Sequence, residues 1–465
     1  MPLAITLPQL HQAVLAAGLM LLSSLAVPAF AQDGEAILFR NVHVIVGDGS
    51  EIANTEVLIR DDEIMGIGAV SLPESVPIRV IDLAGKTLMP ALIAGHAHLG
   101  YQSRDGWGAE YYDLNNLILN LKQYAYYGFA AVFSAGSDPD DLAIELQSLI
   151  ASGAVSAPRF VFAAGMAPPG QGPNNQFLVH TNTVEQNTGM TILRGLESAE
   201  QAREAVREVA AKGIAFIKLW VDDRGGTQSK LSPTLYRAVA EEARGYGIKV
   251  MIHQQTAADM PDLLAAGVDG FLHGRIGDEF DLTIAETLAA QEVFVVPNLG
   301  LGELRREGIG DDPFLAPLLN SESLSRLASG NGERQAFPAP NEQREQSLRA
   351  GFARIDDAGA DLVLGTDAGA VPDHPFGYTG HRELEILVRL GVSPMAALVA
   401  ATGNAAKHLD LGDMGLVQAG YSANLLILNA NPLDDIRNTR RIHSVFLQGQ
   451  EQNRVALRAE LSGRD

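Results

Sequence analysis

The chain has 465 residues, of which 46% are hydrophobic and 19% charged, and its formal net charge is −22. This length allows one large domain or about two to three ordinary ones, and the composition excludes disordered, collagen-like and coiled-coil chains. The acidic balance argues against nucleic acid and anionic membranes as partners. Cysteine is absent, which excludes disulfides, thiolate nucleophiles and iron–sulfur clusters. Any metal must therefore be held by nitrogen and oxygen ligands.

Residues 1–31 have the pattern of a secretory signal peptide. The segment 13–31 is almost wholly apolar, is short for a membrane span and ends in Ala29-Phe30-Ala31. No Lys or Arg precedes it, so an uncleaved anchor or a misassigned start codon is the alternative. We expect cleavage after Ala31, export to the periplasm or the medium, and no stable membrane association afterwards.

Short Val- and Ile-rich runs at both ends of the mature chain predict strands. In residues 32–87 these runs are broken by Gly, Asp and Asn, which is typical of a small antiparallel sheet. Similar runs return at 423–429 and 442–447, within the C-terminal segment 412–465. Neither piece is long enough to be a stable domain alone. We therefore expect one small β-sandwich domain built from both chain ends.

Between these pieces, from residue 88 to residue 411, short apolar runs alternate with amphipathic stretches. Eight runs predict strands, at 88–98, 130–136, 159–165, 216–221, 249–253, 270–273, 294–299 and 362–367. Six stretches predict helices, at 114–126, 141–150, 199–211, 233–246, 282–290 and 343–357. This α/β alternation favours a (β/α)8 TIM-like barrel. A doubly wound open sheet is the alternative, but its usual G-x-G-x-x-G fingerprint is missing.

Polar side chains interrupt the apolar strands near one end of the expected barrel, and barrel sites lie at the carboxyl ends of strands. His96 and His98 end the first strand, and residues two apart point to the same side, so both imidazoles can reach one ion. Four more candidates come from later strands: Lys218, His253, His273 and Asp367. Each alone has a structural explanation, such as a hydrogen-bonded histidine or a helix-capping aspartate. Their common place at strand ends favours a metal site.

Lys218 is the informative member of this set. A protonated amine repels a divalent ion and is costly to bury without compensation. Carboxylation by CO2 turns it into an anionic carbamate, whose two oxygens can bridge two metals, so we expect an N6-carboxylysine at this position. The ligand set then allows two sites that share it: His96, His98 and Asp367 on one ion, His253 and His273 on the other. Such ligands suit Zn2+, with Mn2+, Co2+ or Fe2+ as alternatives.

The chain resembles the amidohydrolase superfamily over nearly all of its mature length. The matching segments are M-P-A-L-I-A-G-H-A-H at 89–98, F-I-K-L-W-V-D-D-R at 216–224, V-D-G-F-L-H-G at 268–274, G-T-D-A-G at 365–369, H-R-E-L-E at 381–385 and N-P-L-D-D-I at 431–436. The resemblance is closest to the branch of imidazolonepropionase-like and Xaa-Pro dipeptidase-like enzymes, which includes ochratoxin-type amidases. It implies a (β/α)8 barrel, a β-sandwich from both chain ends and a binuclear centre at the residues above.

The sequence departs from the family pattern at three positions outside the expected ligands. Ala91 and Ala94 replace the usual Gly and Asp before H-x-H, and Asn424 replaces the usual Asp of the C-terminal strand. The metal site is unaffected by these changes, whereas the local packing of the first strand is less well defined by the resemblance.

The mechanism that the resemblance implies is metal-assisted hydrolysis of a C–N bond in a dipeptide, an N-acyl amino acid or a related amide. A hydroxide bridging the two ions attacks the carbonyl carbon, and Asp367 relays the proton to the leaving amine. A small-molecule substrate of this class needs a cationic or hydroxyl anchor. The candidates for that role are Arg224, Tyr111, Tyr112 and His180, for which an ordinary surface role is at least as good an explanation.

Two other functions are the alternatives to amide hydrolysis. The dimetal centre also supports lactone or phosphotriester cleavage, because the same nucleophile attacks either electrophile. A non-catalytic scaffold would be expected to have lost ligands, whereas all six are present here. The long connections 166–196 and 300–339 predict lids or assembly contacts, and we expect a homo-oligomer.

Overall fold

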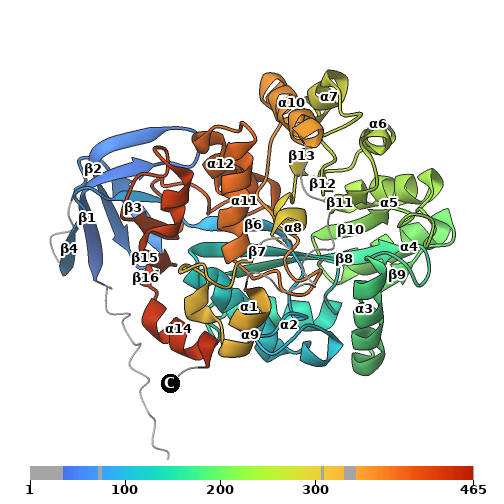
Figure 1. Cartoon of the computed structure of the whole chain (residues 1–465), viewed down its shortest axis with the longest axis horizontal. Coiled ribbons are helices and arrows are strands. Elements are labelled where there is room, and N and C mark those ends of the chain that lie inside the picture. Colours follow the sequence, from blue (N-terminus) through green and yellow to red (C-terminus); the bar gives the residue numbers. More distant parts are fainter. Residues whose placement is uncertain (1–34, 72–75, 305–307, 329–341, 464–465) are drawn as a thin grey trace, which may run out of the picture.

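The structure is a computed structural model that describes residues 35–71, 76–304, 308–328 and 342–463. The expected signal peptide lies outside these described residues, as does part of the connection 300–339. Two β-sheets organise the described chain, a mixed sheet at one end of the molecule and a parallel barrel sheet beside it (Figure 1). No helix within the described ranges has both the length and the apolar character that crossing a bilayer requires.

Both ends of the chain contribute to the mixed sheet, as the sequence predicts. Its strands are β1 Ala36–Ile45, β2 Glu51–Arg60, β3 Glu63–Ile67, β4 Ile78–Asp82, β5 Thr87–Pro90, β14 Leu425–Leu428, β15 Ile442–Leu447 and β16 Gln450–Glu451. The hydrogen-bonded order is β16-β15-β14-β5-β1-β2-β3, with β4 beside β1. The sheet curls until the Ile64 amide donates to the Tyr421 carbonyl oxygen at 2.8 Å. Inside it, Phe39 of β1 meets Phe446 of β15 edge to face.

The second sheet is the barrel that the sequence predicts. Its parallel strands are β6 Leu92–Ala97, β7 Phe129–Ala135, β8 Arg159–Ala167, β10 Phe216–Val221, β11 Lys249–Gln254, β12 Gly270–Leu272 and β13 Phe294–Val296, with the short β9 Leu193–Gly195 beside β8. The eighth run is irregular and closes the barrel through single bridges, Leu362 to Val295 and Ala368 to Ala97. Every residue of β6, β7 and β10 is buried, as expected for strands covered on both faces.

The first predicted strand, 88–98, is divided between the two sheets. β5 ends at Pro90 and pairs with β1 and β14, whereas β6 begins at Leu92 and pairs with β7 in the barrel. Between them, the Ala91 amide donates to the Asn424 carbonyl oxygen at 2.9 Å. Proline lacks an amide proton and favours the end of a strand, which places the division here. One apolar run thus joins the two parts of the molecule.

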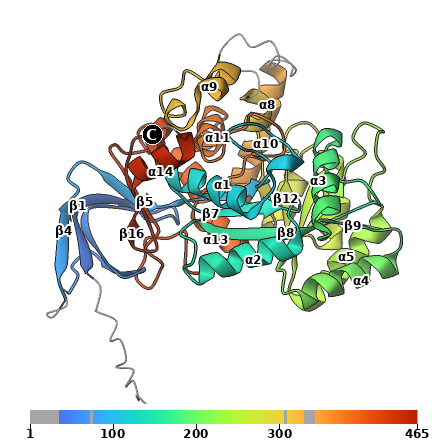
Figure 2. The same cartoon turned by 90° about the horizontal axis from the view of Figure 1, so that it is seen from below.

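Helices cover the outside of the barrel, as Figures 1 and 2 show from two directions. They are α1 Leu114–Tyr126, α2 Asp140–Ala151, α3 Asn175–Thr188, α4 Ala199–Ala211, α5 Pro233–Tyr246, α6 Met260–Ala266, α7 Leu282–Ala290, α8 Gly300–Glu303, α9 Ser321–Leu327, α10 Glu342–Ala358, α11 Tyr378–Arg389, α12 Pro394–Ala400, α13 Gly403–His408 and α14 Arg454–Ser462. α5 has proline at its first position and ends at Gly247 with φ of 69°, both favoured at those helix ends.

The long connection 166–196 is more ordered than its composition indicates. It contains α3 and β9, and α3 begins where the Asn174 side chain accepts a hydrogen bond from the Phe177 amide at 3.0 Å. Phe177 is buried at the mouth of the barrel. The connection is therefore a folded wall of the barrel mouth and not an open loop.

Candidate metal centre

The carboxyl ends of the barrel strands open into one cavity of about 500 Å³. Four of the six candidate donors line it: His98, His253, His273 and Asp367. His96 and Lys218 are fully buried. The six side chains come from β6, β10, β11, the end of β12 and the closing segment. Five of them stand at or near strand ends, as the sequence predicts, whereas Lys218 lies inside β10 and the predicted strand-end position is wrong for it.

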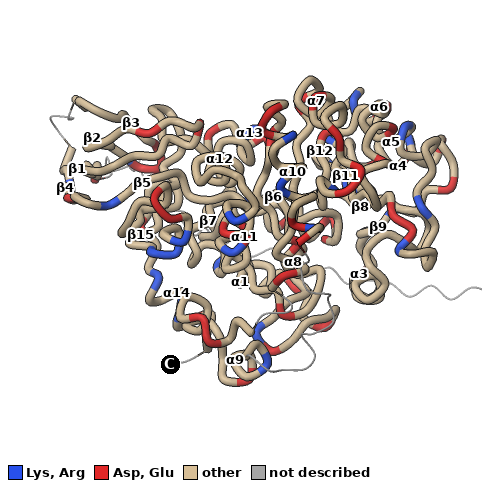
Figure 3. Tube along the Cα trace, turned by 45° about the horizontal axis from the view of Figure 1, so that its top comes forward, with Lys and Arg blue, Asp and Glu red and all other residues tan. Residues whose placement is uncertain are grey.

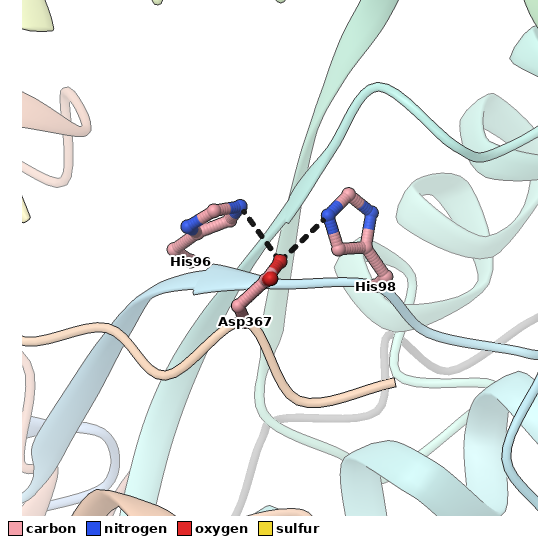
Figure 4. A group of neighbouring side chains, drawn as sticks. All are labelled: His96, His98 and Asp367. Carbon is pink, nitrogen blue, oxygen red and sulfur yellow. Dashed lines mark ion pairs between the residues drawn. The ribbon is translucent and has the colours of Figure 1, made fainter. Parts of the chain in front are cut away.

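His96, His98 and Asp367 form what we call the first donor group. Asp367 Oδ1 lies 3.0 Å from His98 Nε2 and 3.3 Å from His96 Nε2. Both imidazoles point at this carboxylate (Figure 4), and one donor atom from each residue lies within 4.8 Å of the others. Asp367 has φ of +61°, a conformation that is costly for a non-glycine residue and that often occurs at functional sites.

His253, His273 and Lys218 form what we call the second donor group. The two imidazole rings lie 4.6 Å apart, and the His273 ring lies 4.7 Å from that of His96, which joins the two groups. Lys218 lies in the middle of β10, and a side chain in place of Gly136 (φ +80°) would collide with it. The glycine therefore leaves room for the lysine.

The second donor group already has a polar neighbour at one of its nitrogens. His253 Nε2 lies 2.8 Å from Asp222 Oδ2 and 3.0 Å from Arg224 Nη1. Arg224 also donates to Asp222 at 3.2 Å and to the Gly172 carbonyl oxygen at 2.9 Å. Asp222 and Arg224 thus contact Nε2, one of the two His253 nitrogens that could bind an ion.

Burial sets the protonation of the donors. It lowers the pKa of His96, His253 and His273 well below the ordinary value, and nearby cationic groups lower it further. These imidazoles are therefore neutral at neutral pH and can offer a lone pair to a metal. Burial also lowers the pKa of Lys218 to about 7, so a substantial fraction of its amine is uncharged at that pH.

Two supporting residues that the sequence pattern does not mark hold the imidazoles. Ser137 Oγ lies 2.7 Å from His98 Nδ1. Asn298 Nδ2 lies 2.8 Å from His96 Nδ1 and 3.3 Å from His273 Nδ1. Turning the Asn298 amide would place Oδ1 against a protonated Nδ1, the arrangement that favours a metal at Nε2. Both residues stand at strand ends, the one sequence signal that could have identified them.

The donor set fits divalent metal ions. His96 Nε2, Lys218 Nζ and Asp367 Oδ1 are buried and have no hydrogen-bond partner within the described chain. Buried polar atoms without a partner are uncommon, because each loses its interaction with water. A shared ion would satisfy all three, and imidazole with carboxylate oxygen is a usual zinc ligand set. The first donor group therefore fits a divalent ion, as the sequence predicts.

Only one of the four residues predicted to contact the substrate lies on the cavity wall. Arg224 lines the cavity, whereas Tyr111, Tyr112 and His180 are not among its lining residues. The Tyr112 hydroxyl donates to buried Asp138 at 2.8 Å. His180 Nδ1 accepts from the Ala109 amide at 3.1 Å, and its ring packs on Trp107. These contacts hold the wall made by α3 and the chain before α1.

Comparison with known proteins agrees with this geometry. The model of the amidohydrolase family matches residues 87–451. Ochratoxinase from Aspergillus niger is 24% identical over 430 residues, which cover 85% of this chain and 81% of that protein. Two solved structures are similar: a Xaa-Pro dipeptidase with methionine bound in its active site (TM-score 0.67, 24% identity, 90% of this chain and 99% of that one) and molinate hydrolase (TM-score 0.72, 21% identity, 91% and 96%).

The family match extends from the last strand before the barrel to the end of the mixed sheet and covers every donor described above. The solved structures share the fold over nine-tenths of the chain. The chain belongs to the amidohydrolase family and is a hydrolase of amide bonds.

Proposed function

We propose that the protein is a binuclear, zinc-dependent amidohydrolase whose Lys218 is carboxylated. The observation that carries this proposal is the convergence of six donors at one cavity. Five of them are buried, and three of these have an atom without a hydrogen-bond partner in the described chain. The first donor group would hold one ion. His253 and His273 would hold the other, and a carbamate on Lys218 would be shared.

The lysine environment supports carboxylation. An amine must be neutral to attack CO2, and the new N–C bond forms with release of one proton, which leaves a carbamate anion. The lowered pKa of Lys218, about 7, supplies neutral amine under mild conditions. The carbamate would also replace a buried cation by an anion between the two donor groups, where two divalent ions favour negative charge.

The ions, when bound, would supply a water of lowered pKa and a Lewis acid for the substrate carbonyl. Asp367 would accept the proton of the attacking water and return it to the leaving amine, because its carboxylate lies both in the first donor group and on the cavity wall. Asn298 and Ser137 orient the imidazoles through Nδ1. Phe177 and Trp220 line the mouth and exclude bulk water from the reacting amide.

For the substrate we propose an amide of an amino acid, as in a dipeptide or an N-acyl amino acid. Support comes from a similar structure named as a Xaa-Pro dipeptidase with bound methionine, and from the relative named ochratoxinase. The cavity of about 500 Å³ is large enough for such a molecule. We further propose export after cleavage near Ala31 and self-association, which N-terminal sequencing and light scattering would test.

Metal content and turnover together test the proposal. Protein prepared with zinc and bicarbonate should contain two ions per chain and hydrolyse a member of a panel of N-acyl amino acids and dipeptides. His253→Asn should lose one ion and most activity, whereas His443→Asn, an exposed histidine of the mixed sheet, should lose neither. A protein without metal, or turnover confined to lactones or phosphotriesters, would overturn the proposal.

A further inference from the structure

The cavity above the donor groups has an unusual set of charged residues for so acidic a protein. Elsewhere in the described chain, acidic and basic residues are interspersed over both sheets and their helices (Figure 3). The charged residues that line the cavity, apart from the histidines, are Arg224, Arg275, Arg344, Glu303, Glu345 and Asp367. Which of these charges are already neutralised decides what the cavity can bind.

Most of these charges have partners. Arg224 is bound to Asp222. Glu303 and Glu345 both accept hydrogen bonds from the Arg389 guanidinium, at 2.5 Å in the case of Glu303. Asp367 belongs to the first donor group. The two glutamates on the rim therefore contribute little negative charge to the interior of the cavity.

Arg275 is the exception. It follows β12 two residues after His273, and its side chain is exposed to solvent and lines the cavity. Within the described ranges it makes no hydrogen bond and no ion pair. A guanidinium so placed has five donors available in a planar fork, which suits a carboxylate.

Apolar side chains make up another part of the wall. Phe177, Trp220, Leu301 and Leu348 line the same cavity. A ligand that satisfied both features would have one bulky apolar group and one anionic group. The amide carbonyl of such a ligand lies between its apolar group and its anionic group, and the bound ions would contact this carbonyl.

We infer that Arg275 is a specificity-determining residue that binds a carboxylate of the substrate, so that the enzyme selects amides with a free carboxylate and a bulky apolar side chain. This inference rests on the proposed amidohydrolase function. Arg275 thus replaces Arg224, one of the anchors expected from the sequence, because Arg224 is neutralised by Asp222 and Arg275 is not.

A matched pair of substrates tests the inference. N-acetyl-L-phenylalanine and N-acetyl-phenethylamine differ only in the carboxylate. Arg275→Met should raise KM about 10- to 100-fold for the first, with kcat nearly kept, and change the second less than threefold, as expected for loss of one charge-assisted pair. Arg275→Lys should recover part of the loss. Arg437→Met, which removes an exposed arginine far along the chain, is the control for charge alone.

Three results distinguish a failure of the role of Arg275 from a failure of the proposed function. Equal effects of Arg275→Met on both substrates, or a wild-type enzyme that does not prefer the acid, would overturn the role of Arg275 and leave the amidohydrolase proposal standing. If neither amide is hydrolysed by the two-metal protein, the proposed function fails for this class. Calorimetric binding of 3-phenylpropionate then decides the inference: weaker binding to Arg275→Met than to Arg437→Met supports it, and equal binding overturns it.

Discussion

The two donor groups are built from the same barrel but differ in how complete they are. The first group has three donor atoms within 4.8 Å of one another, and Ser137 and Asn298 orient its imidazoles. In the second group, His253 Nε2 is occupied by Asp222 and Arg224, and Lys218 is buried without a hydrogen-bond partner in the described chain.

This difference is one of charge more than of position. The histidines of both groups are packed ring against ring. The first group includes the carboxylate of Asp367 and can hold a cation as it stands, whereas the second offers two neutral imidazoles and an amine. We infer that the first site fills with metal alone and that the second needs the carbamate on Lys218. The substitutions and conditions that follow, together with the test of Arg275, measure this contrast and its consequences.

Removing the carboxylate of the first group should have the largest effect. In Asp367→Asn, kcat should fall by roughly 10²- to 10⁴-fold, the range for loss of a general acid–base group. The amide oxygen is still a neutral ligand, so at saturating zinc the protein should keep its metal. Steady-state kinetics and elemental analysis on the same sample check both points. A wild-type rate would exclude Asp367 from proton transfer.

Removing the lysine should abolish the second site alone. Lys218→Met keeps the approximate volume of the side chain but cannot form a carbamate. The metal content should therefore fall from two ions to one, whether or not bicarbonate is present. For the same reason, wild-type protein depleted of CO2 should bind one ion and recover the second on addition of bicarbonate. Binding of two ions by Lys218→Met would show that no carbamate is needed.

The buried amine also gives the metal-free protein a defined pH dependence. The folded pKa of Lys218, about 7, lies below the ordinary value of about 10.5 in the unfolded chain. The unfolded state therefore binds more protons between these values, and stability rises as pH increases from 7 toward 10. The Tm of the metal-free wild type should rise over pH 7 to 9 relative to that of Lys218→Met. Parallel curves for the two proteins would contradict the lowered pKa.

The sequence predicts the barrel, and the structure brings the six candidate donors of the sequence to one place, because both follow from a strong rule. Parallel strands alternate with helices, and polar residues at the carboxyl ends of such strands meet at one end of the barrel. Charged and imidazole side chains at the ends of apolar runs are conspicuous, as His273 and Asp367 are. That both chain ends share one sheet was also predicted, because the apolar residues of each end need the other end to be covered. The expected antiparallel pairing was only partly right, since β4 and β5 run parallel to β1.

The other features of the fold and the site could not be predicted, because hydrophobic periodicity does not say which residues become neighbours in space. Pro90 divides one apolar run between two sheets, and only the partner strands reveal it. Asn298 and Ser137 resemble ordinary turn residues, and their role comes from the imidazoles they touch. Arg275 and Arg224 look equivalent in the sequence, and only the position of Asp222 distinguishes the neutralised arginine from the available one.

The support given by Asn298 can be measured separately from the ligands. Asn298→Ala removes the side chain that contacts His96 and His273 and should weaken zinc binding about 10- to 100-fold, with all six donors present. Competition with a chelator at fixed pH measures the affinity. Asn438→Ala, which removes an amide bonded to the Asn431 carbonyl oxygen away from the barrel mouth, should leave the affinity unchanged. Equal affinities in the two variants would make Asn298 a packing residue only.

The smallest expected effect concerns the pair that occupies His253. Arg224→Met removes a cation 3.0 Å from His253 Nε2 and leaves the Asp222 carboxylate beside it, so the second ion should bind a few-fold more tightly, about 1 kcal/mol. Asp222→Asn leaves the cation uncompensated and should weaken the same ion by a similar factor. Opposite signs in the two titrations would establish that charge governs the second site. If both variants bind more tightly, the pair acts by obstructing Nε2, and the contrast between the two donor groups is steric.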